Sequence, residues 1–136
     1  MQDRPDGDDI RLLGEIGFLA AGRGMPREAE AIAAGFAAWR PASALAGMVR
    51  AIAAMGAGRD DEAARVLRED ALRAEPDSAD AKALLGLALE RAGYRQAAQG
   101  VLEPLAADAG GDDTAGRLAR AVLEARRGPT ATTTGG

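Results

Sequence analysis

A small pattern recurs three times along this chain at an almost constant spacing. A glycine stands at Gly24, Gly58 and Gly93, so the interval between copies is 34 and then 35 residues. An alanine follows each glycine by five residues, and a glycine or alanine precedes each by seven; these positions are Ala29, Ala63 and Ala98, and Gly17, Ala51 and Gly86. A period of this length predicts a stack of helical hairpins, because one such hairpin is too small to bury its own apolar face.

Signals that start and stop helices divide the chain into seven predicted helices. Pro26 suits the first turn of a helix, where its missing N–H costs nothing. Ser43 and Ser78 follow breaks at prolines and are good N-caps, and the recurring glycines end the helices before them. The predicted helices span about residues 9–21, 26–39, 43–57, 60–74, 79–92, 95–107 and 114–127.

The predicted organisation is a single all-α domain of three hairpins and a C-terminal capping helix. Residues 9–127 form the predicted repeat domain. Residues 1–8 are predicted to be a disordered acidic lead, and residues 128–136 a disordered tail with little apolar content to pack. A terminal helix that covers the last hairpin is what a short stack requires.

The composition argues against several kinds of function. The 136 residues include no cysteine and no histidine, which removes thiolate and imidazole metal ligands and the usual general base. A formal net charge of −4 argues against a nucleic-acid partner. We therefore expect no enzyme and no cofactor or metal site. The acidic start does not read as a secretory signal, and no stretch is apolar enough to span a membrane, so we expect a cytoplasmic protein.

The repeated positions resemble those of the tetratricopeptide repeat (TPR). That motif has a Leu-Gly pair in its first helix, a glycine turn, an alanine in its second helix with a bulky residue four positions later, and a terminal proline. The matching positions are, unit by unit, Ile16, Gly17, Ala20, Gly24, Ala29, Ala33 and Pro41; Arg50, Ala51, Ala54, Gly58, Ala63, Leu67 and Pro76; and Leu85, Gly86, Leu89, Gly93, Ala98 and Leu102. The resemblance covers about residues 10–107 and implies a right-handed α-solenoid. The chain departs from the motif in lacking its aromatic residues, in Arg50 at an apolar position, and in Gly110 where a proline is expected.

A narrower resemblance bears on function. The chain is similar to the small, alanine-rich, three-repeat chaperones of bacterial type III secretion systems, in runs such as EAEAI, DEAARVLRE and LLGLALERAGY. Those chaperones hold needle or translocator subunits in the cytoplasm before export. The resemblance implies a holding chaperone that binds an amphipathic helix of such a subunit.

The third predicted helix carries two apolar stripes. One stripe consists of small residues, namely Ala44, Gly47, Ala51 and Ala54, and the other of large residues, namely Leu45, Met48, Ile52 and Met55. If the small stripe faces the second helix of its hairpin, the large stripe faces the concave groove of the stack. The predicted partner-binding residues are Phe18, Leu45, Met48, Ile52, Met55, Leu84 and Leu87. Such an apolar surface suits an amphipathic helix. The alternative is that the large stripe is ordinary core.

Other interpretations stay open beside the chaperone. An exposed apolar stripe also favours a homodimer, and a generic TPR scaffold would bridge subunits of an assembly through its convex or terminal faces. Trp39 is predicted to fill the seam to the next unit, and Tyr94 to pack between adjacent hairpins. Arg126 and Arg127 are predicted to be cations that favour a helix C-terminus.

Overall fold

The computed structural model describes residues 22–108 and 113–127, and every regular element in these two segments is a helix. The elements are α2 (Pro26–Trp39), α3 (Leu45–Gly56), α4 (Asp60–Val66), the π-helical turn η1 (Leu67–Ala71), α5 (Leu72–Ala74), α6 (Ala79–Ala92), α7 (Arg95–Ala107) and α8 (Thr114–Arg127). The prediction of an all-α chain is confirmed over these residues.

The helix bounds follow the sequence signals closely. The predicted ranges that match the structure at both ends are 26–39, 79–92, 95–107 and 114–127. The predicted helix 60–74 corresponds to the continuous run of α4, η1 and α5, and the predicted helix 43–57 is slightly shorter in the structure. The predicted helix 9–21 and the predicted disordered segments 1–8 and 128–136 lie outside the described residues.

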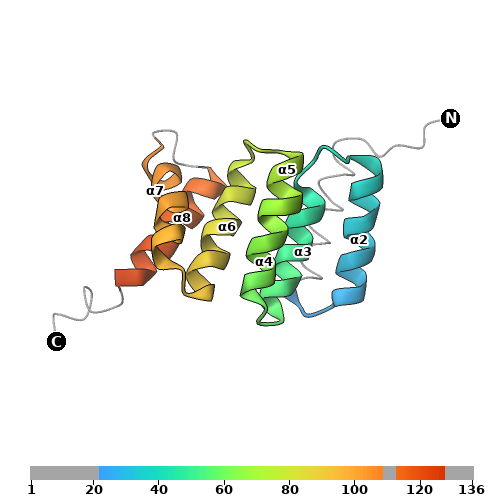
Figure 1. Cartoon of the computed structure of the whole chain (residues 1–136), viewed down its shortest axis with the longest axis horizontal. Helices are drawn as coiled ribbons and strands as arrows, with labels where there is room; N and C mark the ends of the chain where they lie inside the picture. The colour runs from blue at the N-terminus through green and yellow to red at the C-terminus, as the bar shows by residue number, and fades with distance from the viewer. Residues whose placement is uncertain (1–21, 109–112, 128–136) are drawn as a thin grey trace.

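The helices from α2 to α7 stand side by side in chain order, and α8 crosses obliquely behind α7 at the end opposite α2 (Figure 1). Each helix packs on the next: α2 on α3, α3 on α4, α4 on α6, α6 on α7 and α7 on α8. Contacts between more distant elements are those of α3 with α6 and of α6 with α8. The row is therefore held together by a succession of local interfaces.

The recurring glycines share one backbone conformation, which explains their regular spacing. Gly24, Gly58 and Gly93 have φ angles of 72°, 79° and 95°, and no other described residue has a positive φ. This left-handed region is open to glycine without a steric penalty and is common just after a helix. Gly58 and Gly93 therefore reverse the chain between two successive helices, and Gly24 has the same conformation just before α2.

The π-helical turn accounts for the one irregularity in the period. Pro41 follows Gly24 by 17 residues, whereas Pro76 follows Gly58 by 18. A π-turn takes one extra residue into a helix without ending it. The structure contains such a turn at Leu67–Ala71, in the helix that carries the extra residue.

Small residues occupy the points where helices cross most closely. A Cβ atom built on Gly47 would lie 2.8 Å from the backbone nitrogen of Ala71 in η1. A Cβ atom on Gly86 would lie 2.3 Å from a terminal carbon of Leu102 in α7. Ala51, at the matching position of α3, is completely buried. The small stripe of α3 therefore faces the second helix of its hairpin, as predicted.

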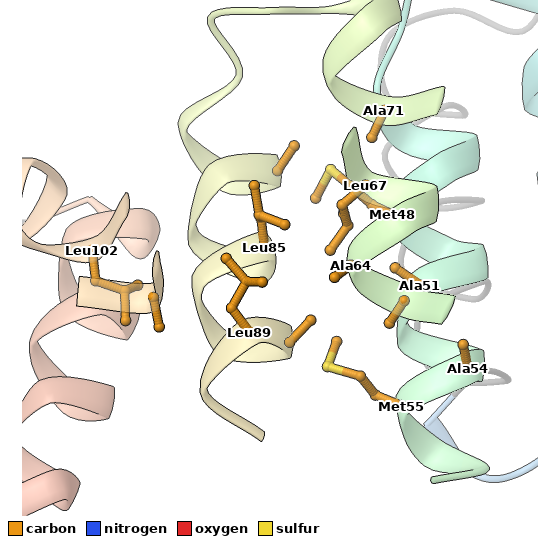
Figure 2. Packing of buried hydrophobic residues seen from close by; sticks show 14 of the residues in the cluster. Met48, Ala51, Ala54, Met55, Ala64, Leu67, Ala71, Leu85, Leu89 and Leu102 are labelled. Atoms are coloured by element: carbon orange, nitrogen blue, oxygen red, sulfur yellow. The ribbon is translucent and has the colours of Figure 1, made fainter. Parts of the chain in front are cut away.

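The core is apolar and is divided into two clusters. The smaller cluster joins α2 to α3 and consists of Ala29, Ala33, Phe36, Ala46 and Val49. The larger cluster runs through α3, α4, η1, α6, α7 and α8, and its middle lies between α3, α4 and α6 (Figure 2). No polar or charged side chain among the described residues is fully buried. Packing is therefore the dominant contribution to stability in this region.

We predict that Gly47→Ala destabilises the protein although alanine is the better helix former. The added methyl group would meet the backbone of Ala71, which cannot turn away as a side chain can. Overpacking of this kind costs about 1–3 kcal/mol, which outweighs the gain of up to about 1 kcal/mol in helix propensity. Urea unfolding followed by circular dichroism measures the change.

Gly100→Ala is the matched control, because Gly100 also lies within a helix and has nothing within 4 Å of a built Cβ. We expect this variant to be as stable as the wild type or more stable. Equal stabilisation by the two substitutions would show that the contact of α3 with η1 is not tight.

Candidate functional site

The predicted partner-binding residues fall into three groups in the structure. Phe18 lies outside the described residues. Met48 and Met55 are buried, with 7% of the surface of each residue exposed. The remaining four are half-buried on two neighbouring helices, α3 and α6, and are Leu45, Ile52, Leu84 and Leu87.

The prediction that Met48 and Met55 line an open groove is wrong. Both side chains extend from α3 toward Leu85 and Leu89 of α6 and belong to the larger core cluster (Figure 2). The face beside the small stripe of α3 is covered by the next unit, so these methionines fill the seam between α3 and α6. For these two residues, but not for Leu45 and Ile52, the outcome is the alternative in which the stripe is core.

The four half-buried residues keep part of their surface at the edge of the core. Ile52, Leu84 and Leu87 pack from outside against the larger cluster. Leu45 packs against the smaller cluster. Ile52 packs against the smaller cluster as well as the larger one. The structure thus brings Ile52 and the two leucines to one cluster, while Leu45 lies at the beginning of α3.

A surface pocket of about 620 Å³ lies where the loop between α2 and α3 meets the start of α6. Its lining is apolar on the side of α3 and charged at the rim, and includes Arg40, Pro41, Ala42, Ser43, Ala44, Leu45, Met48, Glu75, Ser78 and Asp80. Leu45 and the accessible edge of Met48 are therefore the predicted binding residues that meet a concave surface. Periodicity alone did not reveal this pocket, although the two repeated Pro-x-Ser segments that form it are visible in the sequence.

Local hydrogen bonds fix the walls of this pocket. The Oγ atom of Ser43 accepts from the backbone N–H of Leu45 at 3.1 Å, and the Oγ atom of Ser78 accepts from that of Ala81 at 3.1 Å. A carboxylate oxygen of Glu75 accepts from the backbone N–H of Ala44 at 2.9 Å. Ser78 is thus the N-cap of α6, whereas α3 has Ala44 at its N-cap position, and Ser43 and Glu75 accept from the first N–H groups beside it.

Ion pairs join helices along the row. Arg50 of α3 donates two hydrogen bonds of 2.9 Å to the carboxylate of Glu30 in α2. Arg91 of α6 pairs with Asp60 of α4 at 2.9 Å and donates to the backbone oxygen of Met55 at 3.1 Å. Arg50, which departs from the repeat motif, therefore has a structural partner on the neighbouring helix.

These contacts shift the pKa values of the paired groups. The hydrogen bond from Arg50 lowers the pKa of Glu30, and the same bond raises the pKa of Arg50. The hydrogen bond from Arg126 of α8 lowers the pKa of Glu90 in α6, and it raises the pKa of Arg126. The prediction that Arg126 interacts with the end of its own helix misses this contact between helices.

Two aromatic residues are more exposed than their predicted roles imply. Trp39 at the end of α2 is 45% exposed, and Tyr94 before α7 is 54% exposed. Trp39 therefore does not fill the seam to the next unit. Tyr94 does border a pocket of about 290 Å³ between α4 and α7, which belong to adjacent hairpins, but about half of the residue stays exposed.

The described residues offer little for metal binding or membrane insertion. No group of three or more acidic side chains within residues 22–108 and 113–127 is arranged to hold a metal ion. In the same part of the chain, no helix combines the length and apolar character needed to cross a membrane.

Comparison with known proteins gives no relative for this geometry. No protein-family model matches the chain, and searches of curated proteins and of solved structures find no match either.

We predict that the contribution of Glu90 to stability depends on pH. Its pKa is lower in the folded than in the unfolded state, so its stabilising effect is complete above the unfolded pKa and is lost as the pH falls through the folded pKa. Glu90→Gln should reduce the free energy of unfolding at neutral pH, and the difference from the wild type should shrink below about pH 5.

Urea unfolding at a series of pH values measures this difference. Glu124→Gln, which removes a carboxylate from an exposed position on α8, is the charge-matched control. A difference between wild type and Glu90→Gln that stays constant with pH would contradict the assignment of the pair.

Proposed function

We propose that this protein is a TPR-like chaperone or adaptor that holds an amphipathic helix of a partner protein. The observation that supports the proposal is the pocket beside Leu45, whose apolar floor and charged rim lie next to a half-buried apolar edge on α3 and α6. The likeness of the repeated positions to the TPR motif favours a stack of hairpins, in which first helices supply the binding surface. Type III secretion is the proposed setting, with a needle or translocator subunit as the partner, and the cytoplasm is the proposed location.

The free energy of burying the remaining apolar surface indicates how tightly such a partner would bind. Full burial of a leucine or isoleucine side chain contributes about 1.5–3 kcal/mol, and each of these four side chains has at most about a third of its surface left to bury. Together they contribute at most about 2–4 kcal/mol, which the costs of association offset. With Met48 and Met55 already in the core, the edge alone binds weakly. The proposal therefore requires a large apolar side chain of the partner to enter the pocket.

The charges at the pocket rim indicate which helix fits. Glu75 and Asp80 lie on the side of α6, and Arg40 lies on the opposite loop. A partner helix with a leucine or phenylalanine as anchor and a basic residue one turn away would place its cation near the two carboxylates. We propose this pattern for the bound segment.

A scaffold that bridges subunits through its terminal faces is the second candidate. The observation that favours it is the exposed face of α8, which carries Arg117, Ala121, Glu124 and Ala125. Such a module would bind through this charged face and would not use the pocket. The two candidates therefore predict loss of binding at different places, namely the pocket between α3 and the start of α6 or the exposed face of α8.

We predict that capture of a partner protein from the cells of origin depends on Leu45. Leu45→Lys should abolish capture, because it places a charge at the apolar wall of the pocket, while helicity measured by circular dichroism stays unchanged. The measurement is affinity capture with the full chain followed by identification of the bound protein. Ala97→Lys, at an exposed position of α7, is the matched control and should retain capture.

The outcomes separate the two candidates. Capture that survives Leu45→Lys but is lost in Arg117→Glu would replace the chaperone proposal with the scaffold. A captured protein without an amphipathic helix would contradict the proposed mode of binding.

A further inference from the structure

Helix α6 leaves one narrow face to solvent. Of its residues, all of which the structure describes, only Asp80 and Arg91 are exposed, and Leu84 and Leu87 between them are half-buried. Successive members of this set are four, three and four positions apart, so they share one face of the helix. The other faces of α6 pack on α3, α4, η1, α7 and α8. We call these four residues the α6 strip.

The spacing of the α6 strip is the same in both chain directions. A second copy of α6 laid antiparallel on the first places Asp80 opposite Arg91 of that copy and Leu84 opposite its Leu87. Two-fold symmetry produces both pairs of opposite charges at once, because such an interface uses the same patch on both copies. Alternating steps of four and three residues are also those of a coiled-coil seam, where side chains of two helices interdigitate. The α6 strip is therefore complementary to itself.

Both charged ends of the α6 strip are available to a second copy. Asp80 forms no ion pair with any described residue. Arg91 donates from Nε to Asp60 and from Nη2 to the backbone oxygen of Met55, which leaves three of the five N–H donors of its guanidinium group. The side chain of Arg91 is 47% exposed, whereas that of Asp60 is 18% exposed. The less exposed carboxylate thus holds the guanidinium group in position, which lowers the entropic cost of a further contact.

The surroundings of the α6 strip favour association, although weakly. The neighbouring helix α3 contributes the half-buried Leu45 and Ile52, and Leu45 lines the same pocket as Asp80. An uncovered apolar edge of this kind favours association. The net charge of −4 on each chain opposes it, but salt screens this repulsion beyond about 8 Å at physiological ionic strength. The apolar area is modest, so we expect the association to depend on protein concentration.

We propose that two copies of this chain form a two-fold symmetric dimer through the α6 strip, with the two α6 helices antiparallel. The dimer goes beyond the proposed function and does not depend on it, because it needs only a second copy. Leu84 and Leu87 also belong to the apolar edge beside the pocket. A partner helix bound along that edge would therefore displace the second copy.

Sedimentation equilibrium of the full chain tests the dimer. We expect the average mass of the wild type to rise from 13.9 kDa toward twice this value as the concentration increases. Asp80→Arg leaves a cation at both ends of the α6 strip and Arg91→Glu leaves a carboxylate at both ends, so each variant alone should dimerise at least about tenfold more weakly. An equimolar mixture of the two should associate within about threefold of the wild type, because each cation then faces a carboxylate.

Asp61→Arg and Arg68→Glu are the matched controls. Asp61 lies in the first turn of α4, as Asp80 does in that of α6, and Arg68 is exposed on η1. Neither control should change the dissociation constant of the dimer. A wild type that stays monomeric up to about millimolar concentration would overturn the proposal. A mixture that associates no more tightly than the single variants, or equal weakening by the controls, would overturn it as well.

The absence of cysteine from the chain allows a second measurement if a charge-reversal variant does not fold. Chains with Leu84→Cys, mixed with chains with Leu87→Cys, should form a mixed disulfide under mild oxidation, because the proposed register places these positions opposite each other. Chains with Ala97→Cys, at an exposed position of α7, are the control. Cross-linking between positions 84 and 87 that is no faster than cross-linking of the control would contradict the antiparallel arrangement and with it the proposed dimer.

Discussion

Close approach between helices at positions without a bulky side chain is the interaction on which the rest of this structure depends. Gly47 allows the backbone of η1 to lie against α3, and Gly86 leaves the space that Leu102 of α7 fills. With only four aromatic residues in the whole chain, the described core consists largely of alanine, leucine and valine. Small side chains bury enough surface only when helices lie close together. The alanine-rich core therefore depends on the glycines, because they permit this close approach.

Much of the fold could be predicted from the sequence because local signals determine it. The glycines with positive φ, the proline at the start of α2 and the serine that caps α6 all act within one turn of chain. These signals specify where a helix begins and ends, and four predicted ranges agree with the structure at both ends. The π-turn is different: the additional residue between Gly58 and Pro76 is visible in the sequence, but the form in which a helix absorbs it depends on tertiary packing.

The candidate site was harder to predict, because it depends on how helices are rotated against one another. The two stripes of α3 were correctly separated, and the small one does face the second helix of its hairpin. The sequence does not show how far α6 covers the large stripe, and this coverage places Met48 and Met55 in the core. The same limit applies to Arg126, since spacing along one helix cannot reveal partners on two others. The pocket arises from two connections that are far apart in sequence, which periodicity within a helix does not address.

The order of the helices also has a consequence for the rate of folding. Neighbours in space are mostly neighbours in sequence, and the connections are short: only two residues separate α6 from α7, and three separate α3 from α4. A low average sequence distance between contacting residues makes the entropic cost of the first native contacts small. All-helical chains of this kind reach the native state in about microseconds to milliseconds. Partly folded forms with exposed alanine- and leucine-rich faces would then be short-lived, which limits the time available for aggregation during synthesis.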